Sequence, residues 1–360
     1  MIPIRFQPLR TVLQRGLSAM GALLLGPVRY DAHVKRTWIR RTVTISAVWL
    51  CALALLALLP LWVIACLLVD LVGRKWRVPT LRLVAFALCW SWLEAIGVSV
   101  AGILWLVGKG KNQRANYALQ RWWAKQLIRS LRITCGFGID VEGVEALSDK
   151  PLLCLGRHAS LGDALVSAWV FGSLAHRFPR YVMKKELLLD PCLDIVGQRI
   201  PNYFVDRGSA AIRQEIDGIR AMAANMLPND VAVIFPEGTR TNDEKRVALV
   251  QRLEKRAPER HAKMVGLERL LPPRVAGATA LLEAIPEGDV VLLWHVGFDG
   301  LDTFVGVRRR LTHAGPHARV VLELYDRASV PSGAAFESWL DDRWLEIDRK
   351  VVDASEPRIG

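Results

Sequence analysis

The chain has 360 residues, a formal net charge of +13 and a hydrophobic fraction of 52%. That fraction is high for a fully water-soluble protein, so we expect part of the chain to lie in a membrane. Much of the positive charge flanks the apolar segments, where it would meet anionic lipid, and this favours a lipid bilayer over nucleic acid as the partner. The six cysteines show no Cys-x-x-Cys spacing, which indicates neither a zinc site nor a disulfide framework.

The excess of apolar residues lies before residue 110. Residues 1–41 form a basic segment that could lie on a membrane surface. Residues 42–69 then contain no charged residue, and residues 83–108 contain only Glu94. Each segment is longer than the roughly 20 residues that a helix needs to cross a bilayer. We therefore predict a two-helix membrane hairpin over residues 42–110.

The orientation of this hairpin does not follow from its charges. Its connector, residues 70–82, is nearly as basic as the flanking segments, so the positive-inside rule distinguishes no side. The helices could span the bilayer with both chain ends in the cytoplasm, or dip into one leaflet. Pro60 and Glu94, near the helix centres, make the second arrangement more plausible. We expect a spanning hairpin, with the catalytic part facing the cytoplasm.

Residues 111–360 show the pattern of an α/β domain. Short apolar segments alternate with helical periodicity, which predicts a mostly parallel sheet with flanking helices. Residues 241–274 interrupt this pattern with mixed charges, and we expect a helical excursion on the surface there. An amphipathic helix is expected near the C-terminus, around Trp344. The predicted strands are Leu152–Leu155, Tyr181–Met183, Tyr203–Val205, Val231–Phe235, Val290–Val296 and Val320–Tyr325.

The first polar cluster at a strand end contains His158 and Asp163. The two residues are five apart, so they point in different directions on one helix, but they can meet if His158 follows a strand and Asp163 begins a helix. A carboxylate bonded to one imidazole nitrogen leaves the other nitrogen free as a base. Alternatively, Ser160 and Asp163 could form a capping box and His158 could be a polar loop residue.

A second cluster, Phe235-Pro-Glu237-Gly238-Thr239-Arg240, follows another predicted strand. Gly238 would let the backbone turn close to a ligand, and the guanidinium of Arg240 suits phosphate or carboxylate. Arg207 follows the strand between the two clusters and could supply a second phosphate contact. Either arginine could instead be a solvated loop residue. His295, on an apolar strand, is expected to be a core histidine.

In this order the motifs resemble those of the glycerolipid acyltransferase superfamily, in particular the 1-acylglycerol-3-phosphate acyltransferases. The His-x4-Asp motif is matched by His158 and Asp163, and the Phe-Pro-Glu-Gly-Thr-Arg motif is matched in full. The second motif is matched from Phe204 to Arg207, with Pro201 in place of the usual glycine. Leu271-Pro-Pro-Arg274, followed by Gly277, looks like a variant fourth motif of one branch. The resemblance covers roughly residues 130–300 and the apolar hairpin.

The resemblance implies a reaction and a role for each motif residue. His158 would be the general base on the acceptor hydroxyl, oriented by Asp163. Arg207 and Arg240 would hold the acceptor phosphate. The donor would be acyl-CoA or acyl carrier protein, the acceptor 1-acylglycerol 3-phosphate and the product phosphatidic acid, with no metal or other cofactor. The remaining residues expected to line the substrate site are Glu237, Gly238, Thr239, Lys184 and Lys185.

Three other functions stay open at this point. The acceptor could be glycerol 3-phosphate, another lysophospholipid or an aminolipid, because Pro201 and the variant fourth motif depart from the usual pattern. The same His–Asp pair could activate water in a thioesterase or phospholipase, although the chain has no Gly-x-Ser-x-Gly nucleophile motif. The positive charge could also belong to a non-catalytic membrane adaptor.

Overall fold

The computed structural model describes residues 37–355 apart from 207, 209–210, 302 and 314–315. Contacts divide the chain into two units, residues 1–44 and 45–360. Only the first turns of helix α2 (Thr37–Ala57) are described in the first unit. Nearly all of the basic segment predicted at residues 1–41 therefore lies outside the described residues.

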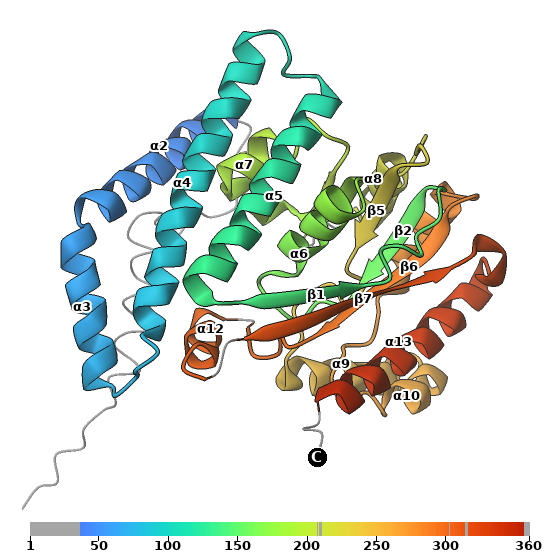
Figure 1. The fold of residues 1–360 in the computed structure, drawn as a ribbon. Helices are drawn as coiled ribbons and strands as arrows, with labels where there is room; N and C mark the ends of the chain where they lie inside the picture. The colour runs from blue at the N-terminus through green and yellow to red at the C-terminus, as the bar shows by residue number, and fades with distance from the viewer. Residues whose placement is uncertain (1–36, 207, 209–210, 302, 314–315, 356–360) are drawn as a thin grey trace, which may run out of the picture. The chain divides into compact units, whose positions relative to one another are not determined.

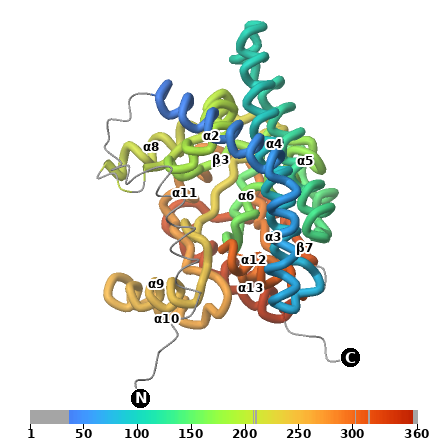
Figure 2. The backbone as a smooth tube through the Cα atoms, turned by 90° about the vertical axis from the view of Figure 1, so that its left-hand side faces the viewer, coloured from blue at the N-terminus to red at the C-terminus, as the bar shows by residue number. Residues whose placement is uncertain are grey.

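The apolar region contains three helices where the sequence predicted two. The first apolar segment is divided into two helices: α2 ends at Ala57, and α3 (Leu59–Val72) begins directly after it. The division occurs here because Pro60 has no N–H to continue the hydrogen-bond pattern. The indole of Trp62 donates to the carbonyl of Leu55 at 2.7 Å and satisfies an acceptor at the break. Figures 1 and 2 show α3 side by side with α4 (Pro79–Leu106).

The turn between α3 and α4 is organised by one buried carboxylate. Asp70 accepts hydrogen bonds from the backbone N–H of Thr80 at 2.8 Å, its hydroxyl at 2.6 Å and the N–H of Leu81 at 3.2 Å. These donors belong to the first turn of α4, whose N–H groups have no partner within the helix. Asp70 therefore caps α4 from the end of the preceding helix.

A seven-stranded sheet forms the centre of the second unit, in the order β1-β7-β6-β2-β5-β3-β4 (Figure 1). Strands β2 to β6 are mutually parallel, whereas β7 is antiparallel to β6 and β1 is parallel to β7. The prediction of a mostly parallel sheet is thus confirmed, and only the edge strand β1 was not predicted. The strands are β1 (Gly138–Glu142), β2 (Leu152–Gly156), β3 (Phe178–Lys184), β4 (Tyr203–Val205), β5 (Asp230–Ile234), β6 (Asp289–Val296) and β7 (His317–Tyr325).

Successive residues of the central strands point to opposite faces and build two cores. In β2, Leu153 and Leu155 belong to one core, and Leu152 and Cys154 to the other. The first core is closed by α8 (Ile212–Met222), α11 (Val275–Ala284) and α13 (Ala334–Ser355). The second is closed by α5 (Gln113–Cys135) and α6 (Asp163–Trp169), which continues as the π-helix η1 (Val170–Leu174).

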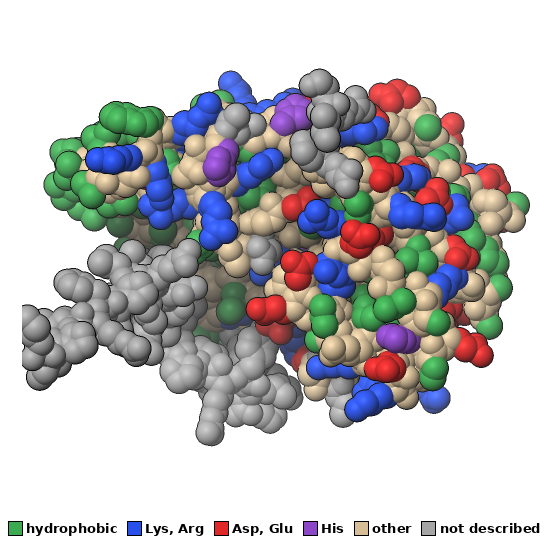
Figure 3. Space-filling model, turned by 90° about the horizontal axis from the view of Figure 1, so that it is seen from below, with side chains coloured by type: hydrophobic (Ala, Val, Ile, Leu, Met, Phe, Trp, Pro, Cys, Tyr) green, Lys and Arg blue, Asp and Glu red, His purple; other side chains and the backbone are tan. Residues whose placement is uncertain are grey.

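The charged region 241–274 contains the helices predicted there, α9 (Asp243–Arg256) and α10 (Pro258–Met264). Arg260 fastens α10 to α13 through two hydrogen bonds of 2.8 Å to Asp341. Figure 3 shows side chains of both signs mixed over this face, with hydrophobic side chains gathered at the end that carries α3. The remaining short helices are η2 (Lys185–Leu189), α7 (Pro191–Ile195), α12 (Phe304–Arg310) and η3 (Arg327–Ser329).

Candidate active site

The two strongest sequence motifs meet at the carboxyl edge of the sheet. His158 follows β2 and Glu237 follows β5, and these two strands are neighbours. Asp163 is the first residue of α6, and its Oδ2 lies 2.9 Å from Nδ1 of His158. The meeting of His158 and Asp163 across a strand end and a helix start is therefore confirmed. Nδ1 is engaged by the carboxylate, which leaves Nε2 for a substrate.

Asp163 also closes the loop that carries the histidine. Its Oδ2 accepts the backbone N–H groups of Ala159 at 2.7 Å and Ser160 at 2.8 Å, and the hydroxyl of Ser160 donates to Oδ1. The carboxylate of Asp163 therefore does both things that the sequence offered as alternatives: it binds the imidazole of His158, and it forms the capping hydrogen bonds with Ser160. Burial raises the pKa of Asp163, but His295 and the hydrogen bond from His158 outweigh it and hold that pKa below its ordinary value. The carboxylate stays ionised next to His158.

His295 is the residue whose place the sequence did not reveal. It is buried near the end of β6, as expected of a core histidine, with 1% of its surface exposed. However, its Nε2 lies 3.3 Å from Oδ1 of Asp163, whereas Nδ1 of His158 contacts Oδ2 of the same carboxylate. The carboxylate of Asp163 therefore faces two imidazoles. Strand order could have suggested this arrangement, because β6 is the other neighbour of β2, but that order cannot be read from one sequence.

Glu237 has a fully buried carboxylate that joins three segments. Oε1 accepts the backbone N–H of His158 at 2.7 Å, and Oε2 accepts the N–H of Leu271 at 3.1 Å and the hydroxyl of Thr241. Burial raises the pKa of Glu237 to about 7, against these hydrogen bonds, which lower it. Because both oxygens are occupied by the chain, Glu237 shapes the site by holding the loops of the first, third and fourth motifs together.

The turn after Glu237 brings an unexpected arginine to the site. Gly238 has φ +73°, and a Cβ atom there would lie 3.0 Å from Nε of Arg274. The backbone N–H of Arg274 also donates to the carbonyl of Pro236 at 2.8 Å. The variant fourth motif thus lies directly against the third, and glycine leaves room for the arginine side chain. Thr239 and Arg240, which follow in the same turn, are half-buried.

The remaining expected substrate residues lie at the ends of β3 and β4. Lys184 is the last residue of β3, and Lys185 donates to Asp206 at 3.1 Å. Asp206 directly follows β4, the neighbour of β3, so this part of the second motif is at the same edge as His158. Arg207 lies outside the described residues.

A buried arginine, Arg157, holds the loop that carries His158 in place. The guanidinium of Arg157 donates to the carbonyl of His295 and, at 2.7 Å, to Oδ1 of Asp299. Arg157 immediately precedes His158, so this contact fixes the loop that carries His158. Its position beside the His158 motif was the only signal in the sequence. Within the described part of the chain, no group of three His, Cys, Asp or Glu side chains could hold a metal ion.

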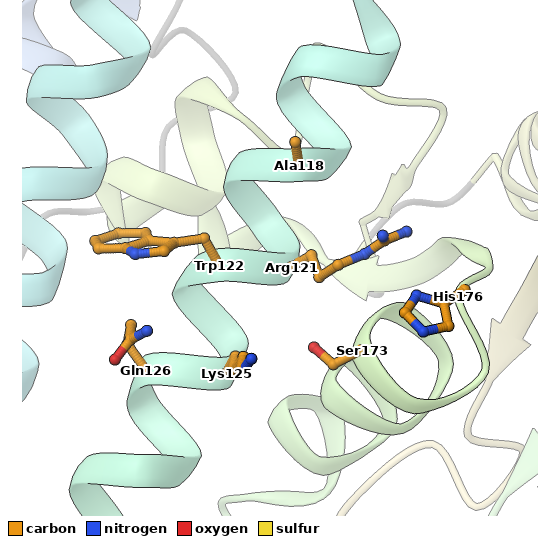
Figure 4. Close-up of a pocket in the computed structure, with 7 residues that line it drawn as sticks. All are labelled: Ala118, Arg121, Trp122, Lys125, Gln126, Ser173 and His176. Atoms are coloured by element: carbon orange, nitrogen blue, oxygen red, sulfur yellow. The ribbon is translucent and has the colours of Figure 1, made fainter.

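A hollow of about 320 Å³ lies away from this edge, between α5 and the turn that follows η1. Figure 4 shows Arg121 and Lys125 on α5 with Ser173 and His176 opposite. The turn after η1 leads into the start of β3, which is the amino end of a strand whose carboxyl end carries Lys184. This hollow therefore belongs to the other edge of the sheet.

The segment that contains these motifs is similar to a known protein family. Residues 138–280 match the model of a protein family described as Acyltransferase. The chain carries an acyltransferase domain. The superfamily that the motifs resemble is thereby confirmed, and this acyltransferase domain makes the protein an enzyme.

Among curated proteins, no sequence matches the chain. Among solved structures, the acyltransferase is similar to the 1-acyl-sn-glycerophosphate (LPA) acyltransferase PlsC from Thermotoga maritima, with a TM-score of 0.42 and 15% sequence identity. The similarity covers 74% of this chain and 97% of that chain.

Proposed function

We propose that the enzyme transfers an acyl chain from a thioester donor, acyl-CoA or acyl carrier protein, to the free hydroxyl of 1-acylglycerol 3-phosphate. The product would be phosphatidic acid, a precursor in phospholipid biosynthesis. The observation that carries the proposal is the His158–Asp163 pair at 2.9 Å, one strand away from the turn that ends in Arg240. It combines a base with a cation suited to an acceptor phosphate.

The chemistry needs only these side chains and the two substrates. Nε2 of His158 takes the proton of the acceptor hydroxyl while the oxygen attacks the thioester carbonyl. The tetrahedral intermediate then collapses and its carbon–sulfur bond breaks. The sulfur takes the proton back from His158 and leaves as the free thiol. Asp163 stabilises the imidazolium formed between these steps, because its carboxylate is ionised and in contact with Nδ1. No metal, other cofactor or covalent enzyme intermediate enters this scheme.

The acceptor phosphate would bind on the β5–β3–β4 side of His158. Arg240, Lys184 and Lys185 would supply positive charge there, from segments that follow β5 and β3. Arg207, expected from the sequence to hold the same phosphate, lies outside the described residues. Thr239 and Gly238 would shape the same turn, with Glu237 holding it in place. A lysophospholipid without a phosphomonoester would leave these cations poorly matched, which favours a phosphate-bearing acceptor.

We further propose that helices α2 to α4 attach the enzyme to a membrane, with the catalytic domain facing the cytoplasm. Two of these helices, Thr37–Ala57 and Pro79–Leu106, are long and apolar enough to span. However, α4 is held against the catalytic domain near both ends, by Arg308 at Thr80 and by Arg199 at Ala101, each at 2.8 Å. Those contacts are about 32 Å apart along the helix, so lipid could surround only one side of it. This supports insertion into one leaflet over the spanning hairpin expected from the sequence.

The test is release of free thiol from acyl-CoA by the purified protein in detergent, with and without lysophosphatidic acid. We expect acceptor-dependent release that falls about 10²- to 10⁴-fold in His158→Ala, because a general base contributes that much. Asp163→Asn should show a similar loss, and His261→Ala, on helix α10, should behave as wild type.

Other outcomes would contradict the proposal. Release that does not depend on the acceptor would indicate a thioesterase. Release with glycerol 3-phosphate but not with its 1-acyl derivative would assign a different acceptor. Full activity in His158→Ala would remove this histidine from the mechanism.

A further inference from the structure

A second concave region lies beyond the end of β6 and the start of β7. It is a hollow of about 450 Å³, within the size range of small-molecule pockets. Its wall contains one acidic side chain among the described residues, Asp299. Four basic side chains line the same hollow: Arg269, Arg310, His317 and Arg319. A cavity with this excess of cations is suited to an anionic ligand.

Two of the four basic side chains pair with acidic residues of the edge strand β1. Nε2 of His317 lies 2.7 Å from Asp140, and Arg319 donates two hydrogen bonds of 2.7 Å to Glu142. Neither carboxylate is part of the wall of the hollow. These pairs hold the imidazole and the guanidinium in place at its rim.

The other two, Arg269 and Arg310, make no ion pair with a described carboxylate, although the charge of Arg269 acts on Asp299 and helps to lower its pKa. No acidic side chain in the described part of the chain lies within ion-pair distance of Arg269 or Arg310, and both are exposed. The acidic side chain of the wall, Asp299, is already bonded to Arg157 at 2.7 Å. Counting the described residues of its wall, the hollow therefore keeps a net positive charge.

The hollow is connected to the catalytic loop by direct contacts. Asp299 in its wall is held by Arg157, the residue that precedes His158. Val296 and Gly297, also in the wall, directly follow His295. In the order of strands, β7 is two places from β2, or about 10 Å at the spacing of neighbouring strands. A ligand anchored here is within reach of the base through a short flexible arm.

We propose that this hollow binds the phosphate groups of the nucleotide part of an acyl-CoA donor, with Arg269 and Arg310 as the principal contacts. The inference rests on the proposed acyl transfer and goes beyond it by naming the donor. The pantetheine arm would run from the hollow past Asp299 and place the thioester at His158. Donor and acceptor phosphates would then bind on opposite sides of the base, over β6–β7 and over β5–β3–β4 respectively.

The shape and charges favour CoA over an acyl carrier protein. A carrier protein brings one phosphodiester and a broad protein surface, whereas CoA brings a pyrophosphate and a further phosphate in one small group. A concavity of about 450 Å³ with clustered cations suits the compact phosphate groups of CoA better than the surface of a carrier protein. Three of the four cationic residues lie after residue 280, outside the matched family segment 138–280, so this site is a feature of the chain's own C-terminal part.

The test uses the double variant Arg269→Ala/Arg310→Ala in the full-length enzyme. Both side chains are exposed, so the fold should be retained. We expect the KM for acyl-CoA to rise about tenfold or more, since losing charge-assisted contacts worth about 1.4 kcal/mol corresponds to that factor. The kcat and the KM for the acceptor should stay near wild type. The matched control is Arg309→Ala, an exposed arginine of α12 outside the hollow.

A truncated donor makes the test specific to the phosphates. Acyl-pantetheine lacks the nucleotide, so wild type and the double variant should use it with the same KM. An unchanged KM for acyl-CoA in the double variant would overturn the proposal. So would a defect that persists with acyl-pantetheine, or one seen with acyl carrier protein but not with acyl-CoA.

Measuring the binding of CoA alone tests the donor site independently of the acceptor and of acyl transfer. Calorimetric titration with CoA alone should give a dissociation constant that weakens about tenfold in the double variant and not in Arg309→Ala. If lysophosphatidic acid proves not to be the acceptor, this result would still support the hollow as a CoA site. If acyl transfer is confirmed but CoA binding is unaffected by the variants, only the donor-site inference fails.

Discussion

At the scale of single residues, the site is organised by two buried carboxylates with different tasks. Asp163 faces the imidazoles of His158 and His295, and its pKa is held low by them despite burial. Glu237 has no cation in direct contact and accepts only neutral donors, so burial raises its pKa to about 7. In the proposed reaction the first carboxylate would stabilise the imidazolium of His158, while the second holds the loops together.

Glu237 should make stability depend on pH. Its pKa is about 7 in the folded protein against 4.5 ordinarily, so the folded state binds more protons over this range and stability falls as pH rises. Glu237→Gln cannot ionise. We expect wild type to lose about 3 kcal/mol more than this variant between about pH 4.5 and pH 7.5. The measurement is urea unfolding at several pH values, and parallel curves for the two proteins would contradict the raised pKa.

At the scale of elements, the C-terminal helix α13 reaches the site through its polar side chains. Asp348 is buried and accepts the backbone N–H groups of Glu268, Arg269 and Leu270 at 2.7 to 2.8 Å. The same loop continues to Leu271, which is bonded to Glu237. One helix thereby positions both the loop beside the basic hollow and the loop of the fourth motif.

Removing this anchor should loosen the loop. We expect Asp348→Ala to lower the free energy of unfolding by about 3 kcal/mol, because three buried N–H groups lose a charged acceptor. Activity should fall with it, since the loop carries Arg269 and leads to Leu271. Asp342→Asn, an exposed position on the same helix that pairs with Lys263 at 2.6 Å, is the control and should cost under about 1 kcal/mol. Equal stability of the two variants would show that the anchor is unimportant.

At the scale of the second unit, the enzyme combines a mixed-charge α/β domain with a strongly apolar helical element. Large hydrophobic side chains that remain exposed on α4 include Ile103 at 56% and Leu106 at 74%. The turns before this exposed helix end are buried against the domain, at Ala95, Val98 and Ala101. An exposed apolar helix end of this kind marks an interaction site, and both proposed lipids partition into membranes.

Charged substitutions at this helix end should detach the enzyme from lipid. We expect Ile103→Glu/Leu106→Glu to bind anionic vesicles about tenfold or more weakly than wild type, because inserting a carboxylate into the bilayer is costly. Activity on a water-soluble short-chain acceptor should be retained. The control is Val265→Glu, 61% exposed at the end of α10. Co-sedimentation with vesicles measures binding, and equal binding of all three proteins would rule out α4 as the membrane contact.

Much of the candidate site could be predicted from the sequence because each motif is contiguous. His158 and Asp163 are connected by a loop of four residues, so their meeting depends only on a strand end and a helix start. The six strands predicted from apolar periodicity are all present, since buried strands in a parallel sheet are apolar on both faces. The motif residues and their order were thus sufficient to predict the reaction class.

Features that depend on which segments become neighbours could not be predicted in this way. The edge strand β1 is only half apolar and pairs with β7, nearly 180 residues later, so its local pattern was weak. The position of His295 next to Asp163 and the basic hollow over β6 and β7 both require the strand order.

The sequence by itself therefore determined the local chemistry, the base, its carboxylate and the glycine turn, because these depend on short spacings along the chain. The tertiary structure alone decided the second histidine, the arginines that surround the site and the side on which the donor would bind. Those features arise from long-range strand pairing and helix docking, whose free energy is shared among many contacts and has no local signature in the sequence.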